Sequence, residues 1–153
     1  MLEVGNGNMS FHENRSHFTM WSMLAAPLIL GADLSDMPEE IFNIVSNKEV
    51  IAIDQDPLGK QAYRYVTNEG VDVWVKPLSG QRYAIAILNK SRDSSDFFYD
   101  WKWRGKCFFA PSGEMGDYRM YDIWKRKEAG TTEKPFEATL GGREVVLLLL
   151  TKA

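Results

Sequence analysis

The spacing of apolar residues changes near residue 60, and this change constrains the fold more than any other feature of the sequence. Before it, apolar residues recur at intervals of three and four, as in an amphipathic helix. After it, they alternate with polar residues, as in a half-buried β-strand. The sequence therefore predicts two parts, residues 1–60 and residues 61–153.

The first part begins with a predicted helix over residues 10–25. Ser10 and Glu13 have the spacing of a capping box, and Pro27 marks the end of the helix. Its apolar stripe comprises Phe11, Phe18, Trp21, Leu24 and Ala25. We expect this stripe to lie against an apolar surface, because an amphipathic helix buries its apolar side.

A short apolar run follows, Leu28-Ile29-Leu30, which suits a strand buried on both faces of a parallel sheet. Ser35 and Asp36 are expected to cap a second helix. Its first turn would hold Pro38, Glu39 and Glu40, and its inner edge Ile41, Ile44 and Val45. A third helical piece is predicted over residues 48–53, before the turn DQDPLG.

One strand between amphipathic helices leaves its edges unpaired, so residues 1–60 are predicted to be an incomplete piece of a repeating βα architecture. The second part is predicted to be an antiparallel β-sandwich, beginning with a hairpin over residues 71–88. Its further strands are expected at residues 97–103, 119–124, 136–140 and 145–151. The fold class is thus α/β plus all-β: the C-terminal fragment of a (β/α)8 barrel followed by an antiparallel β-sandwich.

Composition and charge exclude several classes of protein. A hydrophobic content of 44%, with 25% charged residues, is typical of a folded globular chain. The net charge of -3 gives no basic footprint for nucleic acid. The longest apolar run, residues 145–150, is far shorter than the roughly 20 residues that span a bilayer. A single cysteine, Cys107, can form no internal disulfide and has no zinc-binding spacing.

Several motifs together resemble the C-terminal portion of α-galactosidases of glycoside hydrolase family 27. They are MLEVGN, RSHFTMW, LAAPLILGADL, SNKEVIAIDQDPLGKQ and VWVKPLSG. The likeness is dense over residues 1–80, weakens at DWKWRGKCFFAPSGEMGDYRM and returns at YDIWKRKEAG and REVVLLLLT. Several motifs in one order are far more specific than any one of them.

The resemblance implies a retaining hydrolase of terminal α-linked galactose, built as a catalytic barrel followed by a β-sandwich. Residues 10–25 would be the seventh barrel helix and residues 27–31 the eighth strand. Retaining hydrolysis needs two carboxyl groups about 5 to 5.5 Å apart. In the family both are aspartates of earlier barrel strands, so no catalytic residue is assigned here and the chain alone is expected to be inactive.

Met1 is the one residue of the galactose pocket that the resemblance assigns to this chain, as an apolar contact beside the sugar. In the family, MLEVGN usually follows a WNDPD segment at the end of the seventh strand. A translation start explains the identity of Met1 equally well. The implied partner is an α-galactoside, with homo-oligomerisation left open, and the full-length enzyme would suit a secreted, periplasmic or lysosomal setting.

Three aspartates of this chain are local candidates for acid–base chemistry. Asp33 directly follows the predicted strand, on the face where barrel enzymes place their active sites. Its position favours a structural role, capping the turn into Leu34-Ser35. Asp54 and Asp56 are expected in a turn at the rear of the barrel, where they would accept backbone hydrogen bonds.

The remaining candidates also favour structural roles. His17 is predicted on the packed face of the first helix and His12 on its exposed side, and we predict neither a metal site nor a cofactor. Alternation places Phe97, Tyr99, Trp101 and Trp103 on one strand face as sandwich core, although aromatic rings can also stack on sugars. Glycosylation sequons begin at Asn8, Asn14 and Asn89.

Two functions of different class remain open. The chain is either part of an α-galactosidase or a self-contained, non-catalytic β-sandwich module that binds carbohydrate or mediates assembly. Within the enzyme class, α-N-acetylgalactosaminidase and β-L-arabinopyranosidase share the fold that the resemblance implies.

Overall fold

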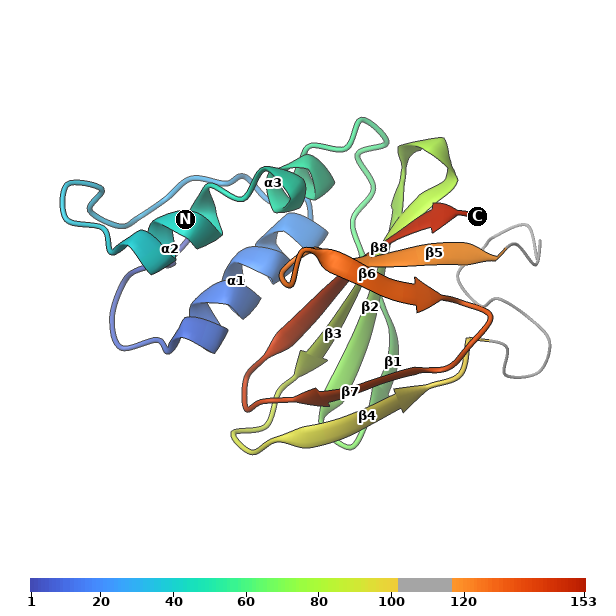
Figure 1. The fold of residues 1–153 in the computed structure, drawn as a ribbon. Coiled ribbons are helices and arrows are strands. Elements are labelled where there is room, and N and C mark those ends of the chain that lie inside the picture. The colour runs from blue at the N-terminus through green and yellow to red at the C-terminus, as the bar shows by residue number, and fades with distance from the viewer. Residues whose placement is uncertain (102–116) are drawn as a thin grey trace.

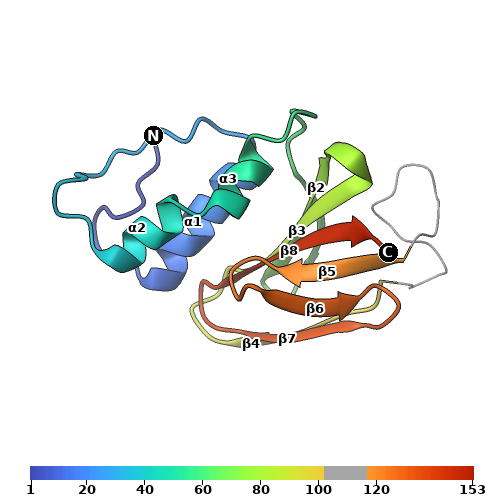
Figure 2. The same cartoon turned by 45° about the horizontal axis from the view of Figure 1, so that its top comes forward.

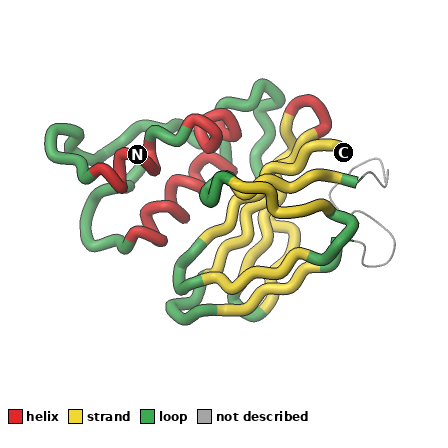
Figure 3. The backbone as a smooth tube through the Cα atoms, viewed as in Figure 1, coloured by secondary structure: helices red, strands yellow, loops and turns green. Residues whose placement is uncertain are grey.

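The computed structural model describes residues 1–101 and 117–153. Its described part has three layers, with helices on one face of a six-stranded sheet and a two-stranded sheet on the other (Figures 1 and 2). Figure 3 shows the α-helices gathered at one end of the molecule and the strands at the other, with one short helical turn among the strands. The observed fold therefore agrees with the predicted class, a helical α/β piece followed by an antiparallel sandwich.

Helix α1, Phe11–Met23, begins as the sequence predicts. Ser10 Oγ accepts a hydrogen bond from Glu13 N, and the Glu13 carboxylate accepts one from Ser10 N at 2.8 Å. This reciprocal capping box satisfies two backbone donors that no helical carbonyl can reach.

The start of helix α2, Glu39–Val45, differs from the prediction. Its N-cap is Pro38, and no side chain caps it, so Ser35 and Asp36 do not have the expected capping role. Ser35 instead donates to Asp33, and a helix cannot easily include the residue before a proline. Ile41 and Ile44 are buried as predicted. Helix α3, Lys48–Asp54, is capped by the Asn47 side chain, a signal that the sequence analysis missed.

The predicted strand at residues 28–30 forms a single parallel bridge, between Leu2 and Leu30. Leu2 N donates to Ile29 O and Gly31 N donates to Leu2 O, both at 2.8 Å. The expectation of burial on both faces is wrong for this chain, since Ile29 is 59% exposed. The parallel direction is as predicted, but within the described residues only one neighbouring segment pairs with this run.

The six-stranded sheet is antiparallel throughout, with the order β1-β2-β3-β8-β5-β6. These strands are Tyr63–Asn68 (β1), Val71–Leu78 (β2), Arg82–Asn89 (β3), Tyr118–Asp122 (β5), Lys127–Thr131 (β6) and Val145–Lys152 (β8). The two-stranded sheet pairs β4, Ser95–Tyr99, with β7, Phe136–Leu140. The predicted hairpin is β2 and β3, joined by the short 3-10 turn Ser79–Gln81. The sequence analysis missed β1 and β6, and Trp103 lies outside the described residues.

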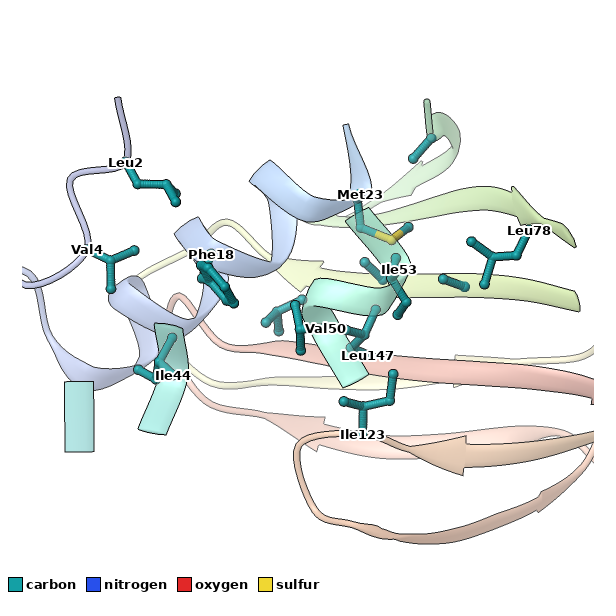
Figure 4. Close-up of a cluster of buried hydrophobic side chains, with 14 of the residues drawn as sticks. Leu2, Val4, Phe18, Met23, Ile44, Val50, Ile53, Leu78, Ile123 and Leu147 are labelled. Atoms are coloured by element: carbon teal, nitrogen blue, oxygen red, sulfur yellow. The ribbon is translucent and has the colours of Figure 1, made fainter. Parts of the chain in front are cut away.

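Strands β2, β3 and β8 are buried on both faces, so they belong to two separate cores. The inner core lies between the two sheets and includes Val73, Val75, Ile85, Ile87, Leu148 and Leu150. The outer core lies between the sheet and the helices (Figure 4) and includes Phe18, Met23, Val50, Ile53, Leu78 and Leu147. Ala84 and Ala86 of β3 also belong to the outer core, where their small side chains leave room for a helix.

Candidate functional site

Met1 and Asp33 lie on either side of the Leu2–Leu30 bridge pair in sequence. The sequence analysis assigned Met1 to the galactose pocket and gave Asp33 a structural role. The Met1 side chain is 73% exposed and immediately precedes Leu2 of the bridge. Asp33 Oδ1 accepts hydrogen bonds from Ser35 N at 2.8 Å and from Ser35 Oγ at 2.7 Å. These bonds lower the pKa of the exposed Asp33 carboxyl. Asp33 therefore stabilises the turn, as predicted.

Asp56 joins the DQDPLG turn to the β2–β3 hairpin. Its Oδ1 accepts from Leu58 N at 3.0 Å and Ser79 N at 2.9 Å, and its Oδ2 accepts from Ser79 Oγ at 2.8 Å and from Arg82 at 3.2 Å. Burial opposes ionisation, but these hydrogen bonds and the Arg82 charge outweigh it, so the Asp56 pKa lies below its usual range. The predicted turn bond is present, together with long-range bonds that sequence spacing could not reveal.

Asp54 lies close to Asp56 in sequence but has different surroundings. It is the last residue of α3 rather than part of the turn, which corrects the prediction. Its side chain is buried, and burial raises its pKa. Gln55 donates to one carboxylate oxygen, and this bond and the positive charge of Lys76 offset only part of the rise in the Asp54 pKa. The two aspartates contact different groups, so they have no common site for acid–base chemistry.

The two histidines both lie on α1. His17 Nε2 accepts from Glu3 N at 3.2 Å, and its ring stacks on Trp21 at a centroid distance of 4.8 Å. Burial lowers the His17 pKa, which favours the neutral acceptor form that this bond requires. His12 is half-buried at an edge-on ring contact with Phe11, not exposed as predicted. Sequence spacing missed this because Gly141, in the β7–β8 turn, lies beside the His12 ring.

Metal-ligating residues do not gather anywhere in the described part of the chain. Among residues 1–101 and 117–153, no group of three or more His, Cys, Asp or Glu side chains is arranged to hold a metal ion. In the same residues, no helix combines the length and apolarity needed to cross a bilayer.

The aromatic residues in and just after β4 lie on both faces of the two-stranded sheet. Phe97 and Trp101 are 8% and 2% exposed and belong to the inner core, as alternation predicts. Phe98 faces outward and is 62% exposed, opposite Glu137 in the strand register. Beside it, Thr139 Oγ1 donates to Asp96 at 2.7 Å. These four outward residues line a shallow hollow, which we call the β4–β7 face.

Two of the three sequons have asparagines that the fold already uses. Asn14 Nδ2 donates to the carbonyls of Met9 and Ser10, and Asn89 Nδ2 donates to Asp93 and Gly141. Both side chains are buried, whereas Asn8 is exposed. Of the three sequon asparagines, only Asn8 therefore presents its side chain at the surface of the folded chain.

Two family models match the chain in sequence order. "Alpha galactosidase A" matches residues 1–56, and "Alpha galactosidase C-terminal beta sandwich domain" matches residues 68–150. Alpha-galactosidase 3 of Arabidopsis thaliana is 35% identical over 155 residues, covering 99% of this chain and 34% of that protein. Alpha-galactosidase A of Cellvibrio japonicus is 34% identical over 159 residues, covering 99% of this chain and 38% of that protein.

Solved structures agree with these matches. Alpha-galactosidase I from Mortierella vinacea superposes with a TM-score of 0.88 at 29% identity, covering 100% of this chain and 38% of that chain. The fold is shared with a family 27 β-L-arabinopyranosidase from Geobacillus stearothermophilus, with a TM-score of 0.80 and 22% identity over 95% of this chain and 31% of that chain. The chain spans about a third of the length of the curated relatives it matches.

Proposed function

Because this chain belongs to the α-galactosidase family, we propose that it forms the C-terminal part of a retaining α-galactosidase that removes terminal α-linked galactose from oligosaccharides or glycoconjugates. The two family matches, in this order along one chain, are the observation that carries this proposal. We also propose that the catalytic and sandwich parts divide near residue 60, between the two matched segments.

The catalytic carboxylates, in this proposal, come from outside this chain. Retaining hydrolysis requires two carboxyl groups about 5 to 5.5 Å apart, one as nucleophile and one as acid. Asp33 and Asp56 are already engaged as hydrogen-bond acceptors in turns, and Asp54, the last residue of α3, is buried. Met1, exposed beside the bridge, would contribute an apolar contact to the sugar.

This chain's contribution would be to position the last barrel elements. Three polar contacts join α1 to the turns before β8 and after β5: Arg15 to Glu144 at 2.8 Å, Ser16 Oγ to Arg143 O at 2.7 Å and Trp124 Nε1 to Thr19 Oγ1 at 3.0 Å. Since α1 connects the two segments of the parallel bridge, these contacts orient the bridge relative to the sandwich.

A chromogenic α-galactoside tests the proposal directly. The isolated chain should give no turnover above buffer, whereas a longer protein carrying an in-frame barrel before Met1 should hydrolyse the substrate. Hydrolysis by the isolated chain would contradict the assignment of the carboxylates. The matching α-N-acetylgalactosaminide and β-L-arabinopyranoside, assayed on the longer protein, distinguish the three enzyme specificities by their kcat/KM ratios.

The β4–β7 face favours a second candidate, a non-catalytic carbohydrate-binding module. An exposed phenyl ring can stack on the apolar face of a pyranose, and the neighbouring Asp96 and Glu137 carboxylates can accept sugar hydroxyl bonds. NMR titration of the chain with raffinose would show shifts confined to this face. Phe98→Ala should abolish them, and Phe42→Ala, another exposed phenylalanine, is the matched control. An unchanged spectrum excludes the module.

A further inference from the structure

Three polar side chains are buried where α1, α3 and β2 meet. Ser22 of α1 is 0% exposed, Asp54 of α3 is 8% exposed and Lys76 of β2 is 1% exposed. Figure 4 shows apolar neighbours from the same elements, Met23, Ile53 and Leu78, gathered in one part of the outer core. These three side chains are therefore largely shielded from bulk water.

The hydrogen bonds at this junction leave several groups without a protein partner. Lys76 Nζ donates to the Ser22 carbonyl at 3.1 Å, which uses one of the three N–H bonds of the ammonium. Ser22 Oγ and Asp54 Oδ1 are buried and have no protein partner. Asp54 and Lys76 form no direct ion pair. The Lys76 charge nevertheless acts to lower the pKa of Asp54, and the Asp54 charge acts to raise the pKa of Lys76.

The hydrogen-bond donors and acceptors of these three side chains determine which kind of ligand can bind among them. The ammonium offers spare donors, the carboxylate oxygen can only accept, and the hydroxyl can do either. A metal cation would be repelled by the ammonium, and an anion by the carboxylate. A water molecule carries two donors and two acceptor sites, and buried waters typically make about three hydrogen bonds to otherwise unpaired groups.

We propose that an ordered water molecule binds at this junction, accepting from Lys76 Nζ and donating to Asp54 Oδ1 and Ser22 Oγ. The water completes a network that connects both helices to the sandwich. Buried side-chain polar atoms in native proteins almost always have a partner, either protein or ordered water, and this site gives one to each of the three groups. The site concerns this chain's own interior and does not depend on the proposed hydrolase activity.

A crystal structure of the chain at high resolution tests the site directly. Density for one water within hydrogen-bond distance of all three atoms is the expected result. A direct Lys76–Asp54 ion pair, or a junction without water density, would overturn the proposal.

The stability of Ser22→Ala tests it independently, through the sign of the effect. If Ser22 Oγ bonds to water, its removal should raise the unfolding equilibrium constant roughly fivefold, as loss of an ordinary hydrogen bond does. If the hydroxyl is unpaired, its removal relieves a buried polar group and should lower that constant. Ser16→Ala is the matched control, because it lies on the same helix and loses a known bond to Arg143 O.

A double-mutant cycle adds the connection to Lys76. With the water present, the effect of Ser22→Ala should shrink when Lys76→Met has already removed a donor to the same water. Strictly additive effects of the two substitutions on the unfolding equilibrium constant would count against a shared water.

Discussion

The two faces of the six-stranded sheet are covered in different ways. The inner core, against the two-stranded sheet, is built from aliphatic and aromatic residues that alternate along each strand. The outer core, against the helices, also encloses polar side chains, among them Thr19, Ser22, Asp54 and Lys76. Apolar packing alone tolerates small shifts between layers, whereas hydrogen bonds fix one orientation. The helical layer is therefore held in place by directional contacts as well as by apolar packing.

The largest expected effect comes from the inner core. Leu148→Ala removes a fully buried side chain between the sheets and should lower the free energy of unfolding by about 3 kcal/mol. Because β8 serves both cores, circular dichroism and tryptophan fluorescence should report one shared urea transition. Leu58→Ala, at an exposed leucine, is the control and should change stability little. Separate transitions for helices and strands would mean that the two cores are independent.

Asp56→Ala should have the next largest effect, because it removes the bonds that join the DQDPLG turn to the β2–β3 hairpin. We expect a loss of about 2 kcal/mol, as for hydrogen bonds to a buried charged group. Limited proteolysis should then cut within residues 57–61, which connect the helices to β1. Asp33→Ala removes bonds within a single exposed turn and should leave this segment resistant. Equal cleavage of both variants would contradict the long-range role of Asp56.

The Arg15–Glu144 pair should contribute about 1 kcal/mol to holding α1 on the sheet. Its side chains are only 13% and 16% exposed, so solvent screens it less than a surface pair. A double-mutant cycle of Arg15→Met and Glu144→Gln, followed by urea unfolding, measures this coupling. A coupling near zero would show that the contact orients the helix without stabilising it.

The smallest effects concern pH and should have opposite signs at two neighbouring aspartates. The Asp56 pKa is lowered in the folded chain, so its stabilisation is present above the ordinary aspartate value of about 3.9 and is lost as pH falls through the folded pKa. The Asp54 pKa is raised, so its contribution is greatest below that value and is lost as pH rises through the folded pKa. Asp56→Asn should therefore destabilise the chain at neutral pH, and Asp54→Asn should stabilise it. The urea midpoints of both variants, measured between pH 3 and 7, test this prediction. A difference of one pKa unit between the folded and unfolded chain corresponds to about 1.4 kcal/mol. A shift of both midpoints in the same direction would contradict the prediction.

Local patterns in the sequence predicted much of the structure. The capping box of α1, the β2–β3 hairpin, β7 and the burial of Phe97 and Trp101 all depend on residues close together in the chain. The family motifs likewise identified the α-galactosidase fold. The assignments of Met1 to the sugar pocket and of the domain boundary to residue 60 stay predictions.

The errors have two different sources. Ser35 bonds within its own turn to Asp33, and α2 begins only after it, with Pro38 as its N-cap. His12 is half-buried because the β7–β8 turn, which is distant in sequence, lies beside it. Alternation predicts the polar side of β2 but cannot show that helices cover it and bury Lys76. The sequence by itself determined most of the elements and the inward side of the strands it identified, because periodicity and caps are local. Only the tertiary structure decided which polar groups would be enclosed, because that depends on how the helices and the sheet pack together.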